Sequence, residues 1–130
     1  MRELTDAELW VLLSLDAESY LHELLMPIDR IEGRQRRRDR PSLEIAEAAA
    51  ALASLAERGF VEIRMTAQHD YDWDRAQPVA IRDVRGVVGD PVNWSVPSEH
   101  AERRGLYLVD ATDEGEGAYR REMEQLERAP

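Results

Sequence analysis

Residues 42–66, SLEIAEAAAALASLAERGFVEIRMT, constrain the fold more than any other stretch, because their periodicity changes within a single run. Apolar side chains first recur at steps of three and four, the spacing of one buried face of an α-helix. After Gly59 the pattern changes to alternation over residues 60–65, which is typical of a half-buried β-strand. The stretch therefore predicts a helix that ends at a glycine and leads directly into a strand.

Residues suited to capping mark both ends of this helix. Ser42 is expected as its N-cap, because a serine hydroxyl accepts a hydrogen bond from a free N–H of the first turn. Gly59 is expected just beyond its last turn, because glycine takes positive φ without steric cost. The stripe that faces the core is predicted to consist of Ile45, Ala49, Leu52, Leu55 and Ala56.

Two helices and a basic loop are predicted on the N-terminal side. Thr5 and Glu8 have the spacing of a capping box, which begins the first helix. Its buried face is predicted to be Leu9, Leu12 and Leu13. A second helix is predicted after Ser19 as its cap, and because of Pro27 it either ends near Met26 or kinks there and continues to Ile31. Its apolar positions are Leu21, Leu24, Leu25 and Ile28. Residues 34–40, RQRRRDR, are predicted to be a polar loop that holds the only concentrated positive charge in the sequence.

A long segment follows the predicted strand before a second strand begins. Residues 67–77 are expected to form a strand end or loop tip. Residues 78–88 predict a short amphipathic helix, with a strand as the alternative because of their β-branched content. Residues 92–96 are expected to be extended, and residues 106–109 to form a strand. Thr112 is predicted to cap a last helix, which carries Tyr119, Met123 and Leu126 on one face.

Composition indicates one soluble globular domain spanning residues 1–130. The formal net charge of −10 predicts general repulsion from nucleic acids and anionic membranes. Cysteine is absent, so the sequence excludes disulfides and thiolate chemistry. No signal-peptide pattern or long apolar run is present, so a cytoplasmic location is expected. Arginine is used without any lysine, which we interpret as a coding bias of a bacterial source.

Two phrases of the sequence resemble a known family. They are LASLAERGFV at residues 52–61 and LYLVDATDEG at residues 106–115. They are similar to the winged-helix domains of bacterial transcription regulators, nearest to the MarR-like and PadR-like groups, over about residues 2–66 and 106–128. The resemblance implies an α+β, winged-helix-like fold with three helices, a small antiparallel wing sheet and a C-terminal helix. One departure is large, because residues 67–105 separate two wing strands that a short hairpin usually joins.

The resemblance also implies two kinds of contact. Winged-helix regulators insert their third helix into the DNA major groove, which would be the helix at residues 42–58 here. They often pair through their terminal helices, so a homodimer is expected. The predicted dimer surface consists of Leu12, Tyr119, Met123 and Leu126.

The residue types on helix 42–58 do not favour base reading. Its positions off the apolar stripe are Glu44, Glu47, Ala48, Ala51, Ser54, Glu57 and Arg58. Reading bases requires Arg, Lys, Asn or Gln donors, and carboxylates repel phosphate. The preceding loop is the candidate phosphate site, with a salt slope of about −4 from its arginines. Those arginines are Arg34, Arg36, Arg37, Arg38 and Arg40. The alternatives are a solvated loop paired with the protein's own carboxylates and a protein-docking loop.

Three aromatic residues of the insertion are candidate contacts for a protein partner. They are Tyr71, Trp73 and Trp94. Aromatic side chains are enriched among residues that dominate binding energy. The alternative for residues 67–77 is an edge strand with a solvated acidic side. Trp94 is also predicted to anchor the insertion to the rest of the domain.

No pattern in the sequence predicts catalysis. Asp70, Asp72 and Asp74 match the start of a calcium loop, but Arg75 replaces its glycine and Ile81 its terminal glutamate. We therefore predict no catalytic, cofactor-binding or metal-binding residues. The sequence favours a non-enzymatic regulatory or protein-interaction module. The alternative is a sequence-specific DNA-binding regulator that uses the arginine loop and helix 42–58.

Overall fold

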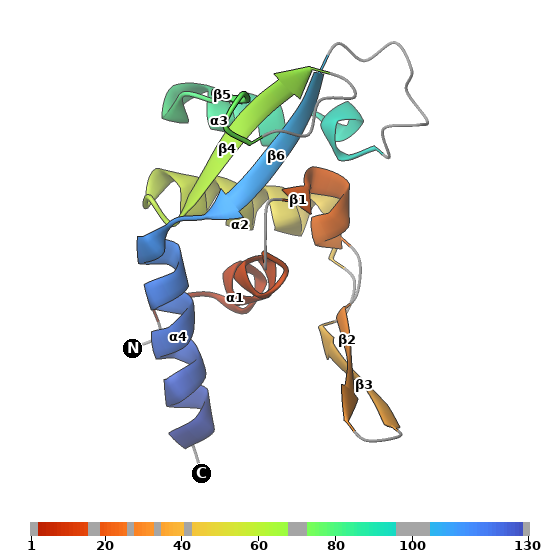
Figure 1. Ribbon diagram of the computed structural model, residues 1–130, viewed down its shortest axis with the longest axis vertical. Helices are drawn as coiled ribbons and strands as arrows, with labels where there is room; N and C mark the ends of the chain where they lie inside the picture. Colours follow the sequence, from red (N-terminus) through yellow and green to blue (C-terminus); the bar gives the residue numbers. More distant parts are fainter. Residues whose placement is uncertain are drawn as a thin grey trace.

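Helices and antiparallel strands together form the fold, which confirms the predicted α+β class (Figure 1). The computed structural model describes residues 3–15, 19–25, 28–32, 35–40, 43–67, 73–95 and 105–128. The helices are α1 (Asp6–Leu13), α2 (Ile45–Glu57), α3 (Ile81–Val88) and α4 (Asp113–Arg128), with 3-10 helices η1 (Leu21–Leu25) and η2 (Pro91–Trp94). The strands are β1 (Ser19–Tyr20), β2 (Ile28–Glu32), β3 (Gln35–Arg40), β4 (Val61–Ala67), β5 (Gln77–Pro78) and β6 (Gly105–Ala111).

The predicted helix–glycine–strand unit is confirmed as α2, Gly59 and β4. Gly59 has φ of 77°, a backbone conformation that other residues rarely adopt. Its N–H donates to the carbonyl of Ala56 at 3.1 Å, and the N–H of Phe60 donates to that of Leu55 at 2.9 Å. These two bonds form a Schellman motif, which satisfies the last carbonyls of the helix and redirects the chain into β4.

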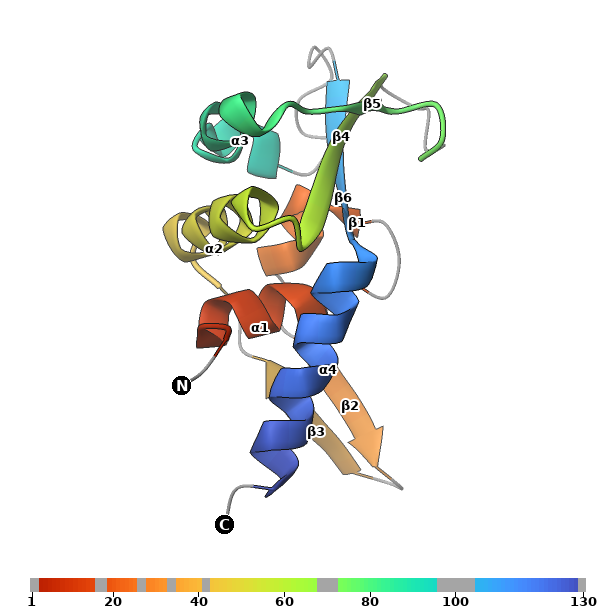
Figure 2. The same cartoon turned by 90° about the vertical axis from the view of Figure 1, so that its left-hand side faces the viewer.

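The N-terminal end and the buried face of α2 differ from the prediction. The N-cap is Glu44, without a side-chain capping bond, whereas the expected cap Ser42 lies outside the described residues. Ile45 is 38% exposed and Ala49 is half-buried. The buried side chains are Ala48, Ala51, Leu52, Ala53, Leu55 and Ala56. The buried face is broader than one stripe because α2 packs between α1 and α3 (Figure 2).

The central pair of the sheet is formed by β4 and β6, which are antiparallel over seven residues. Their register runs from Val61 opposite Ala111 to Ala67 opposite Gly105. The four-stranded order is β1-β6-β4-β5, so these two strands lie side by side although about forty residues separate them. The predicted pairing of the strands at residues 61–65 and 106–109 is therefore confirmed.

The capping box of α1 is confirmed in both directions. The Thr5 hydroxyl accepts from the Glu8 N–H at 3.1 Å, and the Glu8 carboxylate accepts from the Thr5 N–H at 2.9 Å. Leu9 and Leu12 are buried as predicted, while Leu13 is half-buried.

The predicted second helix is wrong. Ser19 and Tyr20 pair with β6 as the short strand β1, so they do not begin a helix. The following leucines form only η1, in which Leu21 and Leu24 are buried. Side chains three residues apart align in a 3-10 helix, so this short element buries them without a full α-helix. The expected helical residue Ile28 begins β2 instead.

The expected polar loop at residues 34–40 is also wrong for its described part. Residues 35–40 form β3, which pairs with β2 in a two-stranded antiparallel hairpin. The register sets Asp29 across from Arg38 and Arg30 across from Arg37. Figures 1 and 2 show the hairpin extending past α1, away from the four-stranded sheet.

Of two short elements of the insertion, one was predicted correctly and one was not. The predicted helix within residues 78–88 is confirmed as α3, in which Val84 and Val88 are buried. Residues 91–94 form η2 rather than an extended segment. The Asp90 carboxylate accepts a hydrogen bond from the Val92 N–H, so it caps the turn that prevents extension. Among the described helices, none is long and apolar enough to cross a bilayer.

Candidate interaction surface

Acidic and small side chains form the solvent side of α2. Glu44, Glu47 and Ala50 are exposed there. Near its C-terminal end, Glu57 accepts two hydrogen bonds from Arg85 of α3, at 2.6 and 3.0 Å. Helix α3 of the insertion therefore packs on α2, through this pair and through its own apolar side.

Arg58, which caps the C-terminus of α2, is held by groups of its own domain. Its guanidinium contacts the Glu8 carboxylate at 3.0 Å and donates to the Glu3 carbonyl at 2.7 Å. It also lies over the Phe60 ring, 4.5 Å from the centroid. The Ser54 hydroxyl donates to the same Glu8 oxygen at 3.0 Å. The arginine that caps α2 is therefore engaged by α1 and the N-terminal segment.

Burial acts to raise the pKa of Glu8, but hydrogen bonds and charge outweigh it. The Thr5 backbone, the Ser54 hydroxyl and the Arg58 charge all favour the carboxylate, so the pKa lies below its ordinary value. The folded state thus holds this group ionised more strongly than the unfolded chain. The resulting stabilisation is present above pH 4.5, the ordinary value, and is lost as pH falls through the lowered pKa.

Replacement of Glu8 by glutamine is expected to lower the free energy of unfolding at pH 7 by about 2 kcal/mol, because charge-assisted hydrogen bonds are lost. The difference should shrink as pH falls below 4.5, and it should vanish once pH has fallen through the lowered pKa, where wild-type Glu8 also becomes neutral. Urea unfolding at pH 7, 5 and 3 measures both effects. The control is Glu124→Gln on the exposed side of α4. An equal loss of stability in both variants at pH 7 would contradict the role of the Glu8 network.

The beginning of α4 is joined to the turn between α2 and β4. The Thr112 N–H donates to the Phe60 carbonyl at 3.0 Å, and its hydroxyl donates to the Gly59 carbonyl at 2.6 Å. The same hydroxyl accepts from the Gly115 N–H at 3.1 Å, which confirms the predicted capping role of Thr112. A Cβ on Gly115 would lie 1.9 Å from the Phe60 carbonyl oxygen. Glycine is therefore required for α4 to approach this turn.

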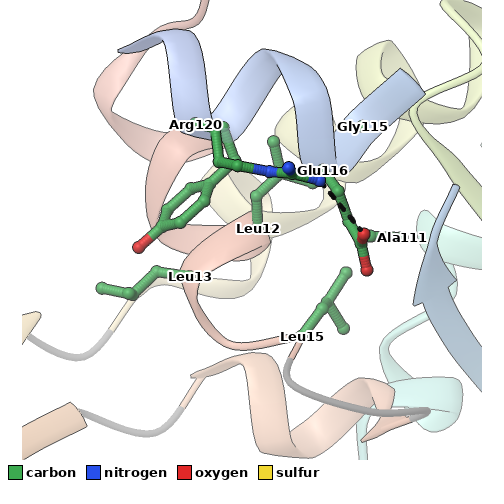
Figure 3. Close-up of a pocket in the computed structure, with 8 residues that line it drawn as sticks. Leu12, Leu13, Leu15, Ala111, Gly115, Glu116 and Arg120 are labelled. Carbon is green, nitrogen blue, oxygen red and sulfur yellow. Dashed lines mark ion pairs between the residues drawn. The ribbon is translucent and has the colours of Figure 1, made fainter. Parts of the chain in front are cut away.

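A groove of about 270 Å³ lies between α1 and the first half of α4 (Figure 3). Its lining combines apolar and polar groups, and an ion pair between Glu116 and Arg120, 3.7 Å apart, borders it. Both side chains of this pair are exposed, so it costs little to open. The lining consists of Leu12, Leu13, Leu15, Ala111, Gly115, Glu116, Tyr119 and Arg120.

The apolar side of α4 continues beyond the groove. Tyr119 and Met123 are half-buried against the core, and Leu126 is 48% exposed. Figures 1 and 2 show the second half of α4 extending past α1 toward the C-terminus. Leu12 and Tyr119 line the groove, and Met123 and Leu126 follow on the same helix face at steps of four and three. Of the four residues predicted as an exposed dimer surface, Leu12 is buried, Tyr119 and Met123 are half-buried, and only Leu126 is largely exposed.

The candidate phosphate contacts fall on one strand. Arg36, Arg37, Arg38 and Arg40 belong to β3, whereas Arg34 lies outside the described residues. The predicted basic loop next to helix α2 is therefore not present in this form. Strand β3 extends past α1, away from α2.

The candidate aromatic contacts are not brought together on the described surface. Tyr71 lies outside the described residues, as do Asp70 and Asp72 of the acidic segment. Arg64 stacks over the Trp73 ring at 4.4 Å and donates to its carbonyl at 2.7 Å. Trp94 is only 3% exposed, and its indole N–H donates to the Val88 carbonyl at 2.7 Å. It belongs to the core and is not part of the surface proposed below.

Sequence reasoning missed two structural roles near this surface. Glu8 was assigned only a capping role, although its second oxygen also binds Ser54 and Arg58. No sequence pattern indicated that position 115 requires glycine, although a Cβ there would collide with the Phe60 carbonyl of the α2–β4 turn. Over the described part of the chain, no three His, Asp or Glu side chains gather closely enough to hold a metal ion.

Comparison of the chain with protein-family models, with curated proteins and with solved structures finds no match. The structure by itself shows the fold class, which is α+β with a four-stranded antiparallel sheet.

Proposed function

We propose that this chain is a non-enzymatic regulatory module on a winged-helix-like scaffold, which pairs with a second copy through α1 and α4. The observation that carries the proposal is the apolar face of α4, which runs from the α1–α4 groove to the exposed Leu126. An apolar helix face that leaves the body of a domain gains stability when another surface covers it.

The composition and contacts of α2 support protein contact over DNA contact. A helix that reads bases needs free donors in the major groove. The exposed side of α2 presents Glu44 and Glu47, and its Arg58 is engaged by Glu8 and the Glu3 carbonyl. Entry of this helix into a groove would also require the acidic net charge of −10 to approach phosphate.

A sequence-specific DNA-binding regulator is the second candidate, and one observation favours it. Strand β3 carries Arg36, Arg37, Arg38 and Arg40 on a hairpin that extends from the body. Such a strand can neutralise phosphates, and its binding would weaken steeply with salt.

Sedimentation velocity over a range of about 1 to 300 µM at 150 mM NaCl tests the proposal. We expect a concentration-dependent dimer, in which Leu126→Glu raises the dissociation constant about tenfold or more, because burying leucine contributes about 2 kcal/mol. The matched control is Val92→Glu, since Val92 is exposed to a similar extent, 45%, on η2. A wild-type chain that remains monomeric throughout contradicts the proposal.

Mobility-shift assays with mixed-sequence duplexes at 50 and 150 mM NaCl test the second candidate. The proposal expects no complex at micromolar protein at either salt concentration. A shift that survives 150 mM NaCl and is unchanged by Leu126→Glu would favour the DNA-binding regulator instead.

A further inference from the structure

The apolar stripe of α4 has one charge of each sign along one of its edges. Tyr119 and Met123 are half-buried and Leu126 is 48% exposed. At 3.6 residues per turn, the three side chains lie within about 60° of one another around the helix. Arg120 and Glu127 are both exposed and are seven residues apart, so they lie on the same flank of this stripe.

Both charges of this flank are available to a partner. Glu127 has no ion pair among the described residues, since the positions three and four residues before it are Glu124 and Met123. Arg120 shares an ion pair with Glu116 at 3.7 Å, but both side chains are largely exposed (Figure 3). Such a pair contributes little to stability, so Arg120 can exchange it for a contact with another molecule.

The other charged side chains of the far half of α4 lie away from this flank. Arg121 is held by Glu3 through hydrogen bonds of 3.0 and 3.1 Å. Glu124 and Arg128 stand two residues before and two residues after Leu126, so each lies about 160° around the helix from it. The edge of the stripe therefore presents Arg120 near one end and Glu127 near the other.

We propose that two copies of the chain pair through antiparallel α4 helices, with the two-fold axis at Met123. Leu126 of each copy then lies on Tyr119 of the other. In the same arrangement, Arg120 of each copy faces Glu127 of the other. The inference rests on the proposed pairing through α1 and α4, and adds the orientation and the register of the two helices.

The spacing of the residues fits this register. Leu126 is three residues after Met123 and Tyr119 is four before it, so a two-fold axis there sets them at levels only about 1.5 Å apart. Glu127 is four residues after Met123 and Arg120 is three before it, which gives the same small offset. Each contact is made twice, because the axis relates the two copies.

The charges select the antiparallel orientation. In an antiparallel pair of helices the same flank of each helix meets, so Arg120 of one copy reaches Glu127 of the other. In a parallel pair each flank faces the opposite flank of the partner, and equal residues lie at one level, so this contact is not made. Complementary charges thus give orientation to a stripe whose apolar contacts alone are non-directional.

The same register covers the groove between α1 and α4. Tyr119 lines this groove together with the half-buried Leu13 of α1, so Leu126 of the other copy lies at its mouth. A cavity of about 150 Å³ admits benzene. The groove of about 270 Å³ therefore has room for one leucine side chain. The arrangement removes the most exposed apolar residue of α4 from water and explains why both helices contribute to the interface.

Charge reversal tests the pairing of Arg120 with Glu127. The variants are Arg120→Glu and Glu127→Arg, both at exposed positions. Arg128→Glu is the control, because it has the same net charge as Arg120→Glu but lies on the side of α4 away from Leu126. Full-length proteins are compared by sedimentation velocity at 50 mM NaCl, with circular dichroism to verify folding.

Each of the two reversals should raise the dissociation constant of the dimer about tenfold, because like charges then face each other twice, while Arg128→Glu leaves it within about threefold. An equimolar mixture of Arg120→Glu and Glu127→Arg should regain near wild-type affinity. In the mixed dimer, both contacts again join opposite charges. A loss that came from the Glu116 ion pair or from helix stability within one chain would not be restored by mixing.

Disulfide formation tests the register, since the chain has no cysteine of its own. Met123→Cys lies on the proposed axis, so mild oxidation should give a covalent dimer on a non-reducing gel. Two copies of Leu126→Cys would be six residues apart along the helices, about 9 Å, and should not form a disulfide. Gln125→Cys, which is exposed on another side of α4, is the control for random collisions.

The outcomes separate this inference from the proposed function. A dimer that is weakened by Leu126→Glu but by neither charge reversal leaves the proposed function standing and overturns the antiparallel register. Faster disulfide formation by Leu126→Cys than by Met123→Cys would indicate a different register, and failure of the mixture to regain affinity would exclude the charge contact. Either result overturns this inference alone. A chain that is monomeric at every concentration overturns both proposals.

Discussion

Replacing Gly115 with alanine is expected to lower the free energy of unfolding by about 3 kcal/mol, the upper range for overpacking a well-packed site. The added Cβ would lie 1.9 Å from the Phe60 carbonyl oxygen and 2.8 Å from the carbonyl carbon, so backbone must move. That carbonyl also accepts the Thr112 N–H, so displacement weakens the junction of α4 with β4. Thermal and urea unfolding measure the loss.

Gly117 provides the control within the same helix. A Cβ there meets only the end of the flexible Arg121 side chain, at 3.3 Å. Because alanine has a higher helix propensity than glycine, Gly117→Ala should stabilise the protein by about 0.5–1 kcal/mol. Equal effects of the two substitutions would mean that the approach at Gly115 is not as tight as described.

Trp94→Ala is expected to cost about 3–5 kcal/mol, the range for truncating a buried aromatic residue. Trp94 is a core residue at the end of η2, and its N–H bond to the Val88 carbonyl joins η2 to the C-terminus of α3. Hydrogen exchange should accelerate most in residues 73–95, because this part of the insertion loses its anchor.

Trp94→Phe separates packing from hydrogen bonding. The phenyl ring keeps most of the apolar volume but leaves the Val88 carbonyl without its indole donor, so a loss of about 1–3 kcal/mol is expected. If Trp94→Ala accelerates exchange equally in α1 and in α3, the residue supports the whole core and does not specifically anchor the insertion.

Local signals in the sequence predicted the central elements because their physical causes are local. The capping box of Thr5 and Glu8, the positive φ of Gly59 and the Thr112 cap each depend on residues within a few positions. The pairing of β4 with β6 is long-range, and it was predicted through the order of elements in a resembling family.

The errors arose where tertiary contacts determine local structure. Leu21, Leu24, Leu25 and Ile28 have helical spacing, but pairing of Ser19 and Tyr20 with β6 left room only for η1. An arginine-rich run has little strand propensity, and the pairing of β3 with β2 overrides it.

Part of the candidate surface could be predicted, since helical periodicity placed Tyr119, Met123 and Leu126 on one face of the last helix. The groove itself could not, because its shape depends on how α1 and α4 meet. Nor does any sequence pattern show that Glu8 and Arg58, fifty positions apart, form an ion pair.

The junction at Phe60 has a mechanical consequence for the far end of α4. Thr112 and Gly115 attach the first turn of α4 to the α2–β4 turn. A rigid-body rotation of α4 about this attachment would be centred on the α2–β4 turn. With an arm of about 24 Å, a rotation of about 5° about that centre moves the last turn by about 2 Å. A rigid α4 that turned about this junction would therefore move Leu126 farther than it moves its own first turn.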